Sequence, residues 1–160
     1  MKRLICLLFG AALVCCTAAC GEPPKAPTEF SAVYRICRDD IDCRGTVTVE
    51  EGDIRVTVSS PGSAKGLSFD YTDDGLTVGY AGHGTKINAD YIPSAAVPSQ
   101  LYRALAYLPQ ASYLGTEDGE DRFSLPSPER AAELRTKDGT PTKLIYPDGS
   151  EVEFREAEQE

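Results

Sequence analysis

The sequence predicts a mainly β fold, an antiparallel meander sheet with one apolar helix, and three observations support this. Apolar and polar residues alternate along several short runs, which is the period-2 pattern of half-buried strands. Glycine-containing turn dipeptides separate these runs. One segment, residues 98–109, lacks the alternation and is apolar nearly all round.

The strand predictions come from the alternating runs. Their apolar positions are Phe30, Ala32, Tyr34 and Ile36, then Val47 and Val49, then Ile54, Val56 and Val58, then Leu67, Phe69 and Tyr71, then Leu76, Val78 and Tyr80. The turn signals are Gly52-Asp53, Asp74-Gly75, Gly82-His83-Gly84, Asp118-Gly119, Asp138-Gly139 and Asp148-Gly149. Glycine adopts positive φ freely and Asp tolerates it, so these dipeptides predict hairpins between neighbouring strands.

The helix prediction covers Pro98 to Pro109, because proline suits the first helical turn and also ends a helix. Its apolar positions on one face are Leu101, Ala104, Leu105 and Leu108. Arg103 is the only charge from residue 101 to residue 108, so we expect the helix to be largely buried. Two placements remain open. The helix packs flat across one sheet face as ordinary core, or it plugs a curved sheet with an apolar cavity beside it.

The N-terminus has the pattern of an export signal. Met1-Lys2-Arg3 is basic, and the uncharged run from Leu4 to Val14 is too short for a bilayer span of roughly 20 residues. The small residues Thr17-Ala18-Ala19 then predict cleavage just before Cys20.

Ala18-Ala19-Cys20 resembles the cleavage motif of bacterial lipoprotein signal peptides, whose cysteine receives a diacylglycerol thioether. The resemblance implies a signal peptide over residues 1–19, a lipid-anchored tether over 20–28 and a single β domain over 29–156. It makes Cys20 the lipid attachment site and places the protein on the extracytoplasmic side of the cell membrane. Cys15 and Cys16 fit less well, because no pair of small residues precedes either. The alternative is an ordinary secretory signal without lipid.

Two cysteines, Cys37 and Cys43, remain in the β domain once the signal peptide and Cys20 are set aside. An even remainder in an exported chain predicts a disulfide. We expect it to cross a hairpin that has a bulge at or next to Gly45, which sets Tyr34 opposite Val47. The alternative is a pair of free thiols.

Composition and motifs argue against several functions. The formal charge is −9, and becomes −11 when Lys2 and Arg3 leave with the signal, which disfavours nucleic acid as a partner and flat docking on anionic lipid. His83 is the only histidine, and there is no G-x-S-x-G motif. We therefore predict no catalytic residues, no metal site, and no cofactor besides the diacylglycerol on Cys20.

Two long stretches carry a second resemblance: "GTVTVEEGDIRVTVSSPGSAKGLSFDYTDDGLTVGY" and "DGTPTKLIYPDGSEVEF". Their order of strands, turns and prolines resembles the LolA-like lipoprotein-carrier superfamily. This resemblance implies a curved, unclosed half-barrel whose concave face holds the helix and, in some members, a hydrophobic ligand.

Together these observations predict a non-catalytic binding module, anchored to the membrane by its N-terminal lipid, for a lipid or other apolar ligand. Its expected cavity is lined by Leu101, Leu105, Leu108, Phe69 and Tyr80. The alternative is a structural or protein-interaction lipoprotein with a filled core and no ligand. The sequence points to no particular protein partner.

Overall fold

The computed structural model describes residues 22–38, 41–128 and 131–157. The predicted signal peptide and Cys20 lie outside these ranges. The strands are β1 (Phe30–Arg38), β2 (Ile41–Glu50), β3 (Asp53–Ser60), β4 (Leu67–Thr72), β5 (Gly75–Tyr80), β6 (His83–Ile87), β7 (Ser112–Glu117), β8 (Glu120–Leu125), β9 (Ala132–Lys137), β10 (Thr140–Ile145) and β11 (Glu151–Glu156).

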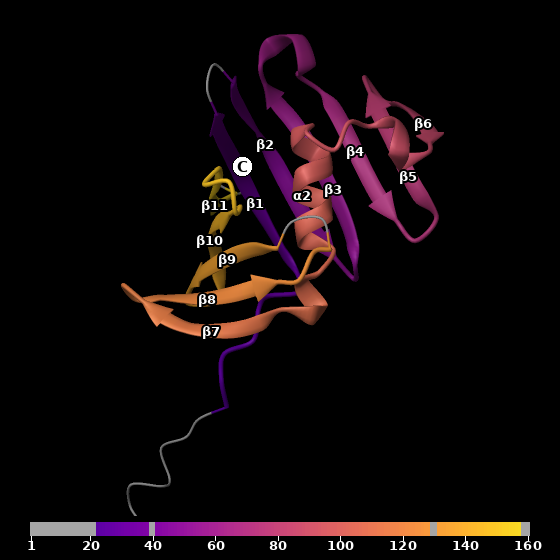
Figure 1. Ribbon diagram of the computed structural model, residues 1–160. Coiled ribbons are helices and arrows are strands. Elements are labelled where there is room, and N and C mark those ends of the chain that lie inside the picture. Colours follow the sequence, from indigo (N-terminus) through magenta and orange to yellow (C-terminus); the bar gives the residue numbers. More distant parts are fainter. Residues whose placement is uncertain (1–21, 39–40, 129–130, 158–160) are drawn as a thin grey trace, which may run out of the picture.

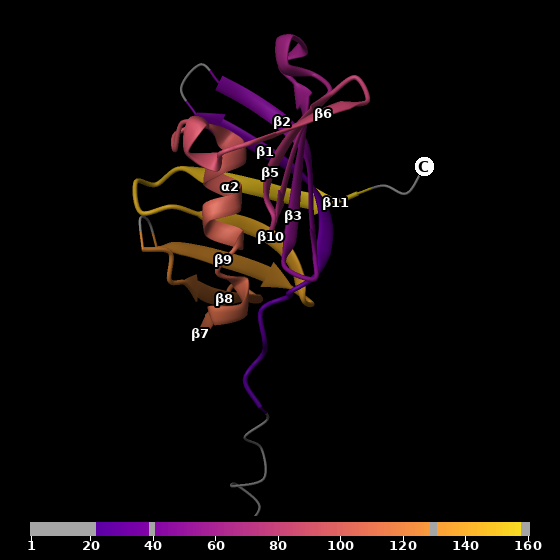
Figure 2. The ribbon, with the colours of Figure 1, turned by 90° about the vertical axis from the view of Figure 1, so that its right-hand side faces the viewer.

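All these strands join one antiparallel sheet, in the order β6-β5-β4-β3-β2-β1-β11-β10-β9-β8-β7. Each strand pairs with its neighbours along the chain, except that β6 and β7 form the two edges while β1 and β11 meet in the middle. The half formed by β1–β6 and the half formed by β7–β11 turn toward each other without closing (Figures 1 and 2). The predicted curved, open meander is confirmed.

Helix α2 (Val97–Leu105) lies inside this bend, on the concave face of the sheet (Figure 2). It is shorter than the predicted segment: the chain leaves the helix after Leu105, and Leu108–Gln110 form a separate 3-10 turn, η3. Two further 3-10 turns, η1 (Gly62–Ala64) and η2 (Ala89–Tyr91), lie in the connections after β3 and β6. One helix on the concave face is the predicted arrangement.

In most strands the period-2 alternation turns one side toward the core and the other toward solvent; β6, whose first four residues are exposed, is an exception. Fully buried side chains come from both halves of the sheet and from the helix: Tyr34, Val47, Ile54, Val56, Leu76, Leu101, Leu105, Phe123, Leu125, Leu134, Leu144 and Val152. They belong to one hydrophobic cluster. The two halves of the sheet therefore share a single core.

The hairpins occur where glycine predicted them. In the β2–β3 connection Glu51 and Gly52 both have positive φ, 50° and 92°. Asp118 with Gly119 and Asp138 with Gly139 repeat this conformation. Two successive residues with positive φ match the twist of the flanking strands, which explains why glycine holds the second position.

The predicted register of the first hairpin is wrong. Only residues 39 and 40 separate β1 from β2, so the pairing continues to the strand ends and sets Cys37 opposite Asp42. Cys43 instead faces Ile36. Cys37 is exposed on the outer face and Cys43 is buried in the core, and both are free thiols. Because successive side chains point to opposite faces, this register separates the two sulfurs; the expected Cys37–Cys43 disulfide is absent.

The predicted bulge in the β1–β2 pairing is absent. The register shifts next to Gly45 only in the pairing of β2 with β3, and the extra residue there is Ser59 of β3. Through Gly45 the β1–β2 pairing is regular, and Tyr34 lies opposite Gly45. The Tyr34 hydroxyl passes over this glycine and donates a hydrogen bond to the Thr57 carbonyl, 3.1 Å away. A Cβ on Gly45 would lie 1.7 Å from that carbonyl oxygen, so only glycine fits.

The two edges of the sheet differ in regularity. Strand β6 pairs evenly with β5, and its first four residues are exposed. Strand β7 has a bulge between Tyr113 and Gly115, which leaves Leu114 exposed. A bulge disrupts the row of backbone groups that another strand would need, so the β7 edge is the less suited to pairing.

Candidate functional site

The concave face is the place where the sequence predicted a ligand site, and α2 is its cover. Leu101, Leu105 and Leu108 are 0%, 1% and 3% exposed, and Phe69 of β4 is buried beside them in the same cluster. The structure therefore brings four of the five predicted cavity residues together. They form packed core, as in the alternative reading of the helix.

Tyr80, the fifth predicted residue, does not join them. It is 60% exposed and ends β5, where it pairs with Leu67 and with His83 across the two neighbouring strands. The alternation correctly placed Tyr80 on the same face as Leu76, which is fully buried. However, this end of β5 extends past the part of the sheet that the helix covers, so Tyr80 is corrected from a cavity residue to a surface residue.

An aromatic stack that the sequence reasoning missed holds α2 against β4. The rings of Tyr71 and Tyr102 are 4.0 Å apart and nearly parallel, at 6°. Burial raises the pKa of Tyr71, and the nearby hydroxyl of Ser99 on the helix opposes this rise. Tyr71 was predicted as an inward strand residue, and no sequence signal identified Tyr102 as its partner.

Partly buried apolar side chains continue from the core toward the β6 edge. They are Leu67, Val78, Ile87, Ile92 and Val97, contributed by β4, β5, β6, the connection to the helix and the first residue of α2. We call these five residues the apolar rim. The side chains of the rim are partly exposed to solvent and also pack against the core.

Two clefts of the described surface are mainly polar. One, of about 500 Å³, is lined by Arg35, Cys37, Asp148, Gly149, Ser150, Glu151 and Glu153. Another, of about 610 Å³, is lined by Glu29, Thr48, Glu50, Glu51, Asp53, Ile54, Arg55, Asp70, Tyr71 and Thr72. No leucine of α2 lines either cleft, so neither is the apolar cavity predicted from the sequence.

Reactive side chains are sparse in the part of the chain that the structure describes. There, no group of three His, Cys, Asp or Glu side chains is placed to hold a metal ion. His83 is exposed in the hairpin after β5. Burial raises the pKa of the Cys43 thiol, which disfavours its reactive thiolate form.

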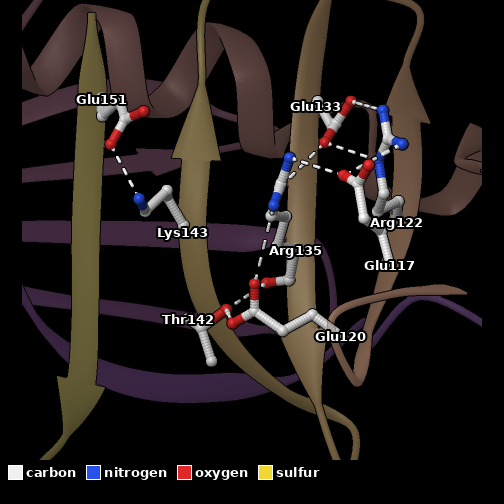
Figure 3. A network of polar contacts seen from close by, with 8 residues as sticks. All are labelled: Glu117, Glu120, Arg122, Glu133, Arg135, Thr142, Lys143 and Glu151. Carbon is white, nitrogen blue, oxygen red and sulfur yellow. Dashed lines mark hydrogen bonds and ion pairs between the residues drawn. The ribbon is translucent and has the colours of Figure 1, made fainter.

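A network of charged residues covers the outer face of β7–β11, opposite the core (Figure 3). Arg122 of β8 forms two hydrogen bonds to Glu133 of β9, at 2.9 and 2.7 Å, and Arg135 bonds the same carboxylate at 3.0 Å. Glu117 accepts from both arginines, at 3.3 and 3.2 Å. Each of these four charged groups has an opposite partner, so the network stabilises the pairing of β7, β8 and β9.

The network extends to β10 and β11. Thr142 donates to Glu120 at 2.7 Å, and Lys143 pairs with Glu151 at 2.8 Å (Figure 3). The hydrogen bonds from Arg122, and then those from Arg135, lower the pKa of Glu133. That carboxylate therefore stays charged to a lower pH than an ordinary glutamate.

None of the helices in the described ranges is long and apolar enough to cross a membrane. No protein-family model matches the chain, and no curated protein matches it. A search of solved structures finds a LolA superfamily protein from Nitrosomonas europaea at 12% sequence identity and a TM-score of 0.47. The match covers 84% of this chain and 86% of that one. At this identity no residue's role carries over.

Proposed function

We propose that the protein is a non-catalytic lipoprotein, anchored by Cys20 on the extracytoplasmic side of the membrane, whose β domain binds a lipid or other apolar ligand under α2. The observation that carries this proposal is the cover itself. Among the residues that the structure describes, a single nine-residue α-helix lies on the concave face of an eleven-stranded open sheet (Figure 2). When the helix shifts, a continuous apolar surface becomes available to a ligand.

The two ends of helix α2 lack side-chain caps. Its N-cap is Ala96, whose side chain cannot accept a hydrogen bond from the first turn. Its C-cap, Ala106, is in the right-handed region rather than in the glycine conformation that commonly ends helices. Isolated helices of this length are marginal in water, so α2 depends on its packing against the sheet. A ligand that replaces this packing can displace it.

The burial of the helix supports a second candidate function. Leu101, Ala104 and Leu105 are at most 2% exposed, so the core is complete without a ligand. A domain filled in this way suits a structural or protein-interaction lipoprotein. The two candidates differ in whether α2 leaves the sheet.

Binding of an environment-sensitive apolar dye tests the first candidate. Substitutions at Gln100 change the stability of α2 for this test. The Gln100 side chain lies on the half-buried face of α2 and donates to the Ala95 carbonyl at 3.0 Å. Gln100→Ala and Gln100→Gly both remove this bond, but glycine disfavours the helix by about 1 kcal/mol relative to alanine. We expect faster dye uptake by the glycine variant. Equal uptake rates in the two folded variants would support the filled core.

Leu105→Glu tests the location of the ligand. A carboxylate on the buried side of α2 should reduce dye affinity at least tenfold, while Arg103→Glu, on the half-buried side, should change it little. Circular dichroism checks that both variants fold. Native mass spectrometry of the purified protein then looks for co-purified lipid, whose mass would identify the ligand class.

Cys20→Ser tests the anchor. Because serine cannot form the thioether, we expect this variant to move from the detergent phase to the aqueous phase in phase partitioning. Cys37→Ser is the matched control, since it removes an exposed thiol of the folded domain and should leave partitioning unchanged. Unchanged partitioning of Cys20→Ser would rule out the lipid anchor.

A further inference from the structure

The segment that follows the predicted lipid site is attached to the domain over part of its length. Ala26 is half-buried and packs against the hydrophobic core, whereas residues 22–25 are exposed. Only the six residues 20–25 then separate a lipid on Cys20 from the docked chain; we call them the leash. A chain extends at most about 3.5 Å per residue, so the leash reaches about 20 Å. A lipid anchor would hold the domain close to the membrane.

The end of the domain nearest the leash is acidic. We define the tether pole as residues 26–30 with the hairpin turns 50–53 and 72–75, which lie at the end of the sheet from which the tether leaves (Figure 1). Its exposed carboxylates are Glu29, Glu50, Glu51, Asp53, Asp73 and Asp74. Four of them line the 610 Å³ cleft, so the tether and the first turn share one acidic surface.

Few cations offset this charge. Arg55 donates a hydrogen bond to Asp70. That bond is the main cause of the raised pKa of Arg55, and the charge of Glu50 adds a smaller contribution. Lys86 reaches the second turn, where a Cβ on Gly75 would lie 3.5 Å from its side chain. In the first turn, Glu50 and Asp53 lie directly opposite each other. Like charges in this position destabilise a hairpin, so the tether pole keeps them at a cost in stability.

The far end of the β1–β6 half is different. We define the wing tip as residues 60–66 and 80–84, which contain Lys65 and His83 but no Asp or Glu. Tyr80 is its large exposed aromatic residue. Strand β3, with eight residues at about 3.3 Å each, separates the two ends by about 26 Å.

We propose that this charge arrangement keeps the anchored domain upright on an anionic membrane, an inference that rests on the anchor proposed for Cys20. Anionic headgroups repel the tether pole, draw out the leash, and leave the wing tip facing away from the membrane. The electrostatic screening length is about 8 Å at physiological salt. A fully extended leash of about 20 Å therefore holds the carboxylates beyond the range of the headgroup charge, whereas a folded-back leash leaves them within it. The height of the domain above the membrane therefore depends on lipid charge and salt.

Neutron reflectometry on supported bilayers measures that height directly. The chain from Cys20 onward, with Cys37→Ser, is coupled at Cys20 to a maleimide lipid, so the height is measured whether or not a host cell acylates the protein. The mass of the chain purified from membranes reports acylation separately. On a bilayer with a quarter phosphatidylglycerol we expect the gap to be wider than on phosphatidylcholine alone by about 10 Å, half the leash, and to close in high salt.

Two variants locate the effect. Glu50→Gln with Asp53→Asn raises the net charge by two at the tether pole and should reduce the widening on the anionic bilayer. Ser59→Lys with Ser63→Lys raises it by the same amount near the wing tip and should leave the widening in place. An equal gap on both bilayers, or an equal response of the two variant pairs, would overturn the proposal.

Discussion

At the scale of single residues, Gly45 and Tyr34 determine how the first three strands meet. The Thr57 carbonyl of β3 approaches Gly45 closely, and the Tyr34 hydroxyl donates a hydrogen bond to that carbonyl. Burial raises the pKa of Tyr34 far above that of a free tyrosine, so the hydroxyl remains a donor throughout the stable pH range of the fold. The sequence predicted the extra residue at Gly45 in the β1–β2 hairpin, whereas the structure has it at Ser59 of β3, because alternation alone does not show which strand of a pair carries a bulge.

We expect Gly45→Ala to destabilise the fold by about 3 kcal/mol or more, because the backbone must move to admit the new Cβ. Gly62→Ala is the control, since a Cβ there meets no atom within 4 Å and the backbone needs no positive φ. Urea denaturation measures both changes in the free energy of unfolding. A small loss for Gly45→Ala would mean that β2 and β3 pair without the close approach.

The two domain cysteines should react at different rates. A maleimide should modify Cys37 in the folded protein as fast as it modifies a small free thiol, because Cys37 is exposed. It should modify Cys43 only after denaturation, because that thiol is buried and its pKa is raised. Mass spectrometry of peptides counts the modified sites. Protection of both cysteines until a reductant is added would indicate that the disulfide forms after all.

At the scale of elements, the alternating pattern predicted the first five strands, and glycine predicted most hairpins. The alternating pattern is weaker in β7–β11, because polar residues such as Arg122, Arg135 and Thr142 stand between few apolar ones. Side-chain pairing explains these strands: their outer residues are stabilised by one another across the sheet. The length of α2 was overestimated because Pro109, which was expected to end it, belongs to the separate turn η3. The position of Tyr80 was missed because the covered area of a sheet depends on where the helix crosses it.

The outer network predicts a pH dependence of stability. The pKa of Glu133 in the folded state is below its ordinary value of 4.5, so its contribution is present above that pH and is lost as the pH falls through the folded pKa. Glu133→Gln should therefore cost about 1 kcal/mol at neutral pH and flatten the acid side of the stability curve. Glu153→Gln is the control, because its ion pair with Arg155 is 3.9 Å long and exposed. Parallel curves for wild type and Glu133→Gln would contradict this.

At the scale of the whole molecule, the described residues form one sheet around one core. We therefore expect Ile54→Ala in β3 and Leu134→Ala in β9 each to cost about 2–5 kcal/mol and to lower the same cooperative transition. Hydrogen exchange should show the β1–β6 and β7–β11 halves opening together in both variants. Separate transitions for the two halves would show that each has a core of its own.

The meeting of β1 with β11 at the centre of the sheet has a consequence for folding during synthesis. Every other strand pair joins neighbours along the chain, so these hairpins involve only local contacts. The seam between the halves must wait for β11, whose partner β1 was made more than a hundred residues earlier. Contacts this distant in sequence form slowly, so the nascent chain stays uncommitted until its last strand arrives. The export that we propose requires an unfolded chain, and this delay would favour it.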